Sequence, residues 1–182
     1  VVALMPRREA SIEVATGADE LWRFLRDFEA LCACIPGVER VEVADTRHAT
    51  LTVREKVGVV PMVLALAATI EREDPPRSLR AVARADHLTM AIDVELQPSG
   101  AKTVLHTVFD VAGSGPLKAV VDSLFERRAT ERTAAFAASL GQRFAASESH
   151  AAPPQALVAQ AAQGWFARLV MRLRALFAGA RT

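Results

Sequence analysis

Six consecutive segments between residues 38 and 112 read as β-strands, most of them with apolar and polar residues in alternation, and this run constrains the fold more than any other feature of the chain. A period of two places successive side chains on opposite faces, as a β-strand requires. Turn-forming residues such as Asp74-Pro75-Pro76 and Pro98-Ser99-Gly100 separate the segments. Because no helical pattern lies between them, we expect an antiparallel meander. The predicted strands are Val38–Ala44, Thr50–Val57, Met62–Arg72, Ser78–Ala85, Leu88–Gln97 and Lys102–Ala112.

Helical segments flank this run on both sides. Residues 10–14 alternate as a short first strand, and residues 18–27 place large apolar side chains on one side of a helix. Residues 29–35 predict a second short helix that the next proline ends, because the residue before a proline avoids the helical region. Ser114-Gly115-Pro116 opens a long helix, whose apolar stripe extends over residues 117–144. This order predicts an α+β fold in which a curved antiparallel sheet wraps around a long C-terminal helix and leaves a cavity.

The charge of the chain is distributed unevenly. All 21 acidic residues lie at or before Glu148, whereas four of the 22 basic residues follow it. The first 148 residues therefore carry a net charge of −3, and the remainder carries +4. This asymmetry predicts an anionic surface as the partner of the C-terminal segment alone. We expect a ligand-binding domain over residues 9–146, an Ala- and Ser-rich linker over residues 147–154, and a basic amphipathic helix over residues 155–182.

The predicted tail helix has the composition of a helix that lies in a membrane interface. At helical spacing its large apolar side chains share one face, and its only charges are arginines. Trp and Phe on an apolar face and Arg beside it favour binding to anionic lipid. Docking on its own domain or on a second copy of the chain is the alternative that stays open. The residues expected to contact the membrane are Trp165, Phe166, Leu169, Leu173, Leu176, Phe177, Arg168, Arg172 and Arg174.

The segment from Met62 to Ile70 is apolar at almost every position. An antiparallel strand with one wet face should alternate, so we expect one face to line the cavity and Val63, Ala65 and Ala67 to lie outside. Strand parity and the helix stripe together predict which residues contact an apolar ligand, and plain core packing stays open as the alternative for each. These residues are Ile35, Val57, Leu64, Leu66, Met90, Ile92, Leu105, Phe109, Leu117, Val121, Leu124 and Phe125.

Few residues suggest catalysis or metal binding. Cys32 and Cys34 have no further ligands near them in the sequence, which favours a structural role over a metal site. His106 and Asp110 share the even-numbered face of the last strand, opposite the apolar odd-numbered face, so we expect both outside the cavity. The sequence contains no Ser/His/Asp set and no glycine-rich phosphate loop. We therefore predict a binding protein with no catalytic residues and no metal.

Composition also predicts where the protein resides. Two cysteines are too few for a disulfide framework, which favours a reducing compartment. The N-terminal residues lack the apolar core of a signal peptide. The longest apolar run, residues 57–70, is too short for a transmembrane helix and is interrupted by Gly58 and Pro61. Basic residues are scattered among acids in the domain, which does not favour nucleic-acid binding. These features predict a cytoplasmic protein.

Two adjoining stretches resemble a known family. Residues 14–27, VATGADELWRFLRD, run on into residues 31–41, LCACIPGVERV, and the combination resembles the opening of the carbon monoxide dehydrogenase CoxG family. Asp74-Pro75-Pro76-Arg77 and Ser114-Gly115-Pro116-Leu117 fall where that family has similar segments. The family belongs to the START-like superfamily, also called SRPBCC or polyketide cyclase/dehydrase. The resemblance covers residues 9–145.

The resemblance implies a START-like helix-grip fold and a non-catalytic accessory protein of a molybdenum hydroxylase of the carbon monoxide dehydrogenase type. It also implies recruitment of that dehydrogenase to the cytoplasmic membrane and an isoprenoid quinone, menaquinone or ubiquinone, as ligand, with no covalent cofactor. The expected partners are an apolar small molecule, the inner face of the cell membrane and the molybdenum-containing dehydrogenase. Two alternatives stay open: a polyketide cyclase/aromatase-like enzyme, and a ligand-free assembly factor.

Overall fold

The computed structural model describes residues 7–57 and 59–151 of the 182. The chain divides into two compact units, Val1–Phe144 and Ala145–Thr182, and the β-sheet lies wholly within the first. The predicted tail helix over residues 155–182, together with the last three residues of the predicted linker, lies outside the described residues.

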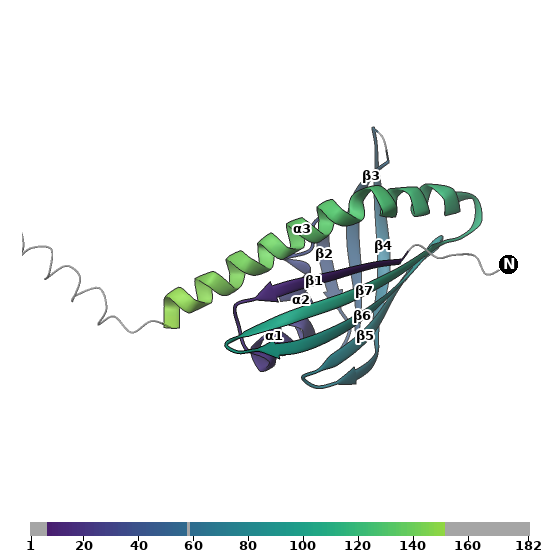
Figure 1. Ribbon diagram of the computed structural model, residues 1–182. Helices are drawn as coiled ribbons and strands as arrows, with labels where there is room; N and C mark the ends of the chain where they lie inside the picture. Colours follow the sequence, from purple (N-terminus) through teal and green to yellow (C-terminus); the bar gives the residue numbers. More distant parts are fainter. Residues whose placement is uncertain (1–6, 58, 152–182) are drawn as a thin grey trace, which may run out of the picture. The chain divides into compact units, whose positions relative to one another are not determined.

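Seven antiparallel strands form one sheet in the order β1-β7-β6-β5-β4-β3-β2 (Figure 1). Strands β2 to β7 each pair with the next along the chain, and β1 closes onto β7, so the predicted meander is confirmed. Turn residues fix where each strand ends, because glycine, proline and aspartate favour tight turns over extended pairing. The strands are β1 Arg7–Val14, β2 Val38–Val43, β3 His48–Val57, β4 Val60–Asp74, β5 Ser78–Ala85, β6 Leu88–Ser99 and β7 Lys102–Gly113.

The helices occupy the places that the sequence predicts. Between β1 and β2 lie α1, Ala18–Arg26, and α2, Phe28–Cys32. The Asp27 carboxylate caps α2 by accepting a hydrogen bond from the Ala30 backbone N–H at 3.0 Å. After β7, a single 3₁₀ turn, η1 over Gly115–Leu117, leads into α3, Lys118–Ala151. Figure 1 shows α3 crossing one face of the sheet.

The end of α3 differs from the sequence prediction. We expect a linker from residue 147, whereas the helix continues to Ala151. The physical reason is helix propensity: the segment AASESHA contains alanine, serine and glutamate, and none of these breaks a helix.

The two faces of the sheet alternate as the parity argument predicts. Along β4, Leu66 and Ile70 are buried, whereas Val63, Ala65 and Ala67 are exposed. Cross-strand partners share a face, and the buried residues of β4 therefore lie on the same face as their partners on β3 and β5. The apolar face is the one that α1 and α3 cover.

A large core closes one end of the molecule. Leu21 of α1, Leu105 of β7 and Leu140 of α3 are each at most 1% exposed and belong to one buried cluster. Within it the rings of Phe24 and Phe144 meet edge to face, with centroids 5.5 Å apart. This cluster fixes the later part of α3 against α1 and the sheet.

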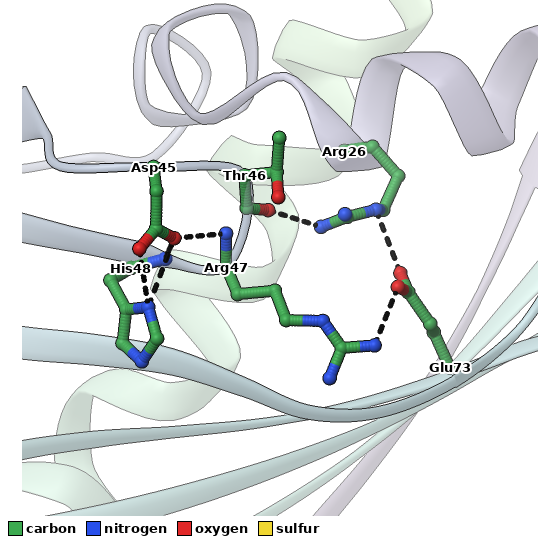
Figure 2. A network of polar contacts seen from close by, with 6 residues as sticks. All are labelled: Arg26, Asp45, Thr46, Arg47, His48 and Glu73. Carbon is green, nitrogen blue, oxygen red and sulfur yellow. Dashed lines mark hydrogen bonds and ion pairs between the residues drawn. The ribbon is translucent and has the colours of Figure 1, made fainter.

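A register shift in β4 turns a charged side chain toward the helices. Pairing with β5 shifts between Ile70 and Arg72, so that two β4 residues oppose one position of β5. As a result Glu73 lies opposite Leu79, a core residue. Its carboxylate forms ion pairs with Arg26 of α1 and Arg47 of the β2–β3 turn, both at 2.9 Å (Figure 2).

The β2–β3 turn is held by its own side chains. The Asp45 carboxylate accepts hydrogen bonds from the backbone N–H of Arg47 at 2.7 Å and from that of His48 at 2.9 Å. The bond from Arg47, followed by the one from the His48 ring, lowers the pKa of Asp45 below its ordinary value. Arg26 also donates to the Thr46 carbonyl at 2.9 Å, so the turn is tied to α1 (Figure 2).

Gly37 allows the segment before β2 to lie against its neighbours. It adopts a φ of +84°, and a Cβ there would lie 2.9 Å from the Arg54 carbonyl oxygen and 3.2 Å from Nη2 of Arg132. Gly100, in the β6–β7 turn, has a φ of +64° but nothing within 4 Å of its notional Cβ. An alanine at Gly37 would therefore meet both backbone strain and a steric clash, whereas an alanine at Gly100 would meet backbone strain without a clash.

We predict that Gly37→Ala lowers the free energy of unfolding more than Gly100→Ala does. The left-handed conformation alone costs about 1–2 kcal/mol for an L-residue, and Gly37→Ala adds a clash with backbone that cannot move cheaply. Urea denaturation of both variants measures the difference. Equal destabilisation would show that the Arg54 carbonyl yields without cost.

Candidate functional site

A second, smaller group of buried residues lies on the same face of the sheet, apart from the main core. It consists of Val53, Leu66 and Ala83, and Val38, Leu51, Ala68, Ala85, Leu88 and Met90 pack against it. Every member comes from the sheet. Among the side chains that the structure describes, the first half of α3 contributes no member, unlike the later part of α3, which supplies Leu140 and Phe144 to the main core.

The helix itself shows the same division. Leu140 and Phe144 are 0% and 4% exposed, whereas Val121, Leu124 and Phe125 are only half-buried. Within each group the positions recur at a spacing of three or four residues, so the members of each group share one side of α3. A ligand placed between the first half of α3 and the strands β3 to β6 would contact these half-buried side chains and the second group of buried residues.

An ionic cluster from two elements interrupts the inward face of α3. Glu55 of β3 forms ion pairs with Arg128, at 3.0 Å, and with Arg132. Arg132 also donates to the Pro36 carbonyl at 2.9 Å, and Arg128 to the Lys56 carbonyl at 3.4 Å. The Glu55 side chain is 15% exposed, while those of Arg128 and Arg132 are 40% and 33% exposed.

This cluster corrects the predicted stripe of α3. The sequence pattern predicts that residues 117–125 and residues 136–144 form one continuous apolar face. In the structure, Arg128 and Arg132 occupy the same face between those two groups, at the spacing of three and four that a helix requires. The helical spacing in the sequence is enough to predict that both arginines lie on that face. Their partner Glu55 is 77 residues away from Arg132, and no local pattern identifies it.

The residues predicted to contact a ligand lie in different surroundings. Leu105 is 1% exposed inside the main core and Ile92 packs against that core, so we assign both to packing. Leu66 and Met90 belong to the second group. The side chains of Val57 and Leu117 lie outside the described residues. The remaining predicted residues are half-buried, namely Ile35, Leu64, Phe109, Val121, Leu124 and Phe125.

The opposite face of the sheet is polar. An open groove of about 660 Å³ is lined by side chains of β4 to β7, including Arg80, Asp93 and His106. Arg80 is paired with Asp93, and His106 Nδ1 lies 2.9 Å from the Ser11 hydroxyl. Asp110 instead lies 3.7 Å from Arg7, so His106 and Asp110 form no dyad. Both lie on the face of the sheet opposite to the buried residues Leu105 and Val111, as their strand parity predicts.

The two cysteines are buried structural residues. Cys32 and Cys34 are 4% and 8% exposed and form no disulfide. Burial raises the pKa of the Cys32 thiol to about 11, so the thiol is protonated at neutral pH. Within residues 7–57 and 59–151, no three His, Cys, Asp or Glu side chains gather as metal ligands would. Among the same residues, no helix is both long and apolar enough to cross a membrane.

Comparison with known proteins identifies one matching family. The model of the carbon monoxide dehydrogenase CoxG family matches residues 11–144. That span contains α1, α2, all of β2 to β7 and the part of α3 that lies over the sheet. No curated protein sequence matches the chain.

Solved structures share the fold at low sequence identity. A conserved protein from Geobacillus kaustophilus is 18% identical with a TM-score of 0.66, over 78% of this chain and 97% of its own. A START superfamily protein from Mycobacterium smegmatis is 18% identical with a TM-score of 0.63, over 76% and 96%. The Zhui aromatase/cyclase from a Streptomyces species is 17% identical with a TM-score of 0.56, over 76% and 93%. The fold is therefore START-like.

We predict that truncation to alanine distinguishes the buried and the half-buried parts of α3. Leu140→Ala should lower the free energy of unfolding by about 2–5 kcal/mol, the usual cost of removing a fully packed leucine. Leu124→Ala should cost clearly less, because its side chain has fewer neighbours to lose. Chemical denaturation of the two variants measures both costs. If the costs are equal, the first half of α3 is as closely packed as the second.

Proposed function

The chain belongs to the CoxG family of carbon monoxide dehydrogenase, and on that premise we propose that it is a non-catalytic accessory protein of a molybdenum-containing dehydrogenase. In this proposal its interior holds an apolar ligand such as an isoprenoid quinone, menaquinone or ubiquinone. Its basic C-terminal segment then docks it on the cytoplasmic face of the membrane. The protein would thus bring an apolar electron acceptor from the membrane to the dehydrogenase.

The observation that carries the ligand proposal is the contrast along α3, where Val121, Leu124 and Phe125 are half-buried and Leu140 and Phe144 are packed in the main core. In this proposal a hollow lies between those half-buried side chains and the sheet residues Leu66 and Met90. Small-molecule sites are mostly apolar hollows with a few polar groups at defined places. A carrier of an isoprenoid needs such a wall and needs no reactive group.

An aromatase/cyclase-like enzyme is the rival that the shared fold raises. Such an enzyme needs a free acid or base within reach of its substrate. Among the strand residues that the structure describes, the acids Glu55 and Glu73 reach the helix side of the sheet, and each is already paired with two arginines. This arrangement supports binding over acid–base catalysis. Fold alone does not decide the question, since one fold hosts many functions.

We predict that Leu124→Trp removes ligand binding with little loss of stability. Added bulk in a packed core costs about 1–3 kcal/mol, whereas added bulk in a hollow fills space that the ligand needs. The measurements are a titration of the lipid-free protein with decylubiquinone and its thermal unfolding. Ala67→Trp is the matched control, since Ala67 is exposed on the opposite face. Loss of binding in the control, but not in Leu124→Trp, would move the site to the outer face.

We predict that the full chain binds vesicles containing anionic lipid, and that the binding weakens as salt is added. Each arginine near such a surface contributes about 1 kcal/mol, and salt screens exposed charges beyond about 8–10 Å. A triple variant with Arg168, Arg172 and Arg174 changed to glutamine should lose most of this binding. Vesicle co-sedimentation at rising ionic strength measures it. Binding that ignores salt and lipid charge would show that the arginines do not drive the docking.

A further inference from the structure

The side of α3 that faces the sheet carries charge next to the half-buried apolar residues that line the proposed hollow. Along the helix, the apolar residues Val121, Leu124 and Phe125 are followed by Arg128 and Arg132 before the packed core begins. Glu55, on the strand opposite, follows the buried residue Val53 by two positions and therefore shares its face. The cluster thus lies between the sheet and the helix, next to the apolar wall.

The cluster has an excess of positive charge and of hydrogen-bond donors. Two guanidinium groups face one carboxylate, so the three groups together carry a charge of +1. Each guanidinium has five N–H donors. The hydrogen bonds and ion pairs of Arg128 engage Glu55 and the Lys56 carbonyl, and those of Arg132 engage Glu55 and the Pro36 carbonyl. Several donors on each arginine are left for a further acceptor.

The side chains of both arginines are partly exposed to solvent, and an ion pair that served only to hold the helix to the sheet would not need this exposure. Their side chains are 40% and 33% exposed, while the acid between them is 15% exposed. A group placed beside Leu124 and Phe125 lies one helical turn from Arg128, because residues three and four apart are neighbours on a helix. A ligand in the hollow can therefore reach the guanidinium groups.

We propose that Arg128 and Arg132 form a polar-head subsite of the interior, which takes an amphiphile whose head presents an acceptor oxygen, carbonyl or carboxylate. The apolar chain of that amphiphile lies along Val121, Leu124 and Phe125. This inference rests on the proposed function, since it requires the hollow to bind a ligand at all. It adds the orientation of the ligand and the chemistry of its head. Glu55 positions the arginines and competes with the head for their donors.

The test compares three probes on the lipid-free full chain: decylubiquinone with carbonyl oxygens, palmitate with a carboxylate, and decylbenzene with no acceptor. Displacement of the neutral fluorophore 1-aminoanthracene gives each dissociation constant. Both probes with a head should bind more tightly than decylbenzene by about tenfold or more, the usual effect of a hydrogen bond to a charged group. The two headed probes also distinguish a quinone-like ligand from a fatty acid.

Variants separate head recognition from a structural role. Arg128→Met keeps the apolar stem and leaves the Arg132–Glu55 pair in place, so it should cancel the preference for a head while decylbenzene binding stays unchanged. Arg128→Lys should retain part of the preference for palmitate. The matched control is Arg127→Met, because Arg127 is the exposed neighbour on α3 and bonds only to the Ser123 hydroxyl in the described structure.

The variant Glu55→Gln distinguishes ligand-head recognition from a purely structural role, because the two roles predict different changes in palmitate affinity. Removal of the competing carboxylate frees donors and charge, so palmitate should bind more tightly than it does to the unchanged protein. A merely structural cluster would lose stability in this variant and gain no affinity. The inference is overturned if all three probes bind equally well, or if Arg128→Met weakens all three alike. If none of the probes binds, the proposed ligand-binding function fails together with the inference.

Discussion

One long helix crosses the curved antiparallel sheet of this protein (Figure 1). Two kinds of interaction hold the helix to the sheet, apolar packing and ion pairs. Leu140 and Phe144 are packed into the main core, and Arg128 and Arg132 are paired with Glu55 on β3. Before the arginines, α3 makes no comparable packing with the buried residues of the sheet, as far as the described side chains extend. The hollow that we propose lies beneath this first half of α3, where the apolar side chains of the helix are only half-buried.

The ion pairs of Arg128 and Arg132 with Glu55 introduce charge, which apolar packing does not. A partly buried pair of arginines is costly to desolvate without a partner, and Glu55 meets that need with a single negative charge. The remaining charge and donors then become the polar feature of an otherwise apolar interior. The Pro36 carbonyl completes this ionic contact by accepting a hydrogen bond from Arg132, and a Cβ at Gly37 would lie 3.2 Å from Nη2 of that arginine. A loop, a strand and a helix therefore jointly define one border of the candidate site.

Much of this fold is predictable from the sequence, because strand periodicity and turn residues act locally. The exposed Val63 and the buried Leu66 follow their predicted faces, since side chains alternate along a strand. The features that escaped prediction depend on distant partners. No residue near Glu55 in the sequence indicates that Glu55 pairs with Arg132. The register shift after Ile70 also has no local sequence signal, and it is this shift that turns Glu73 toward Arg26 and Arg47. In the sequence, Arg128 and Arg132 look like breaks in the apolar stripe of α3. Their spacing of three and four residues from the apolar positions nevertheless keeps them on the same face of the helix.

If the interior holds one amphiphilic molecule, as we propose, native mass spectrometry of the full chain purified from cells should detect it. We expect a population heavier than the bare chain by one ligand mass, with solvent extraction yielding a molecule that has a long apolar chain and an oxygen-bearing head. A bare mass under gentle ionisation, together with an extract free of any such molecule, would contradict this proposal and favour a ligand-free assembly factor.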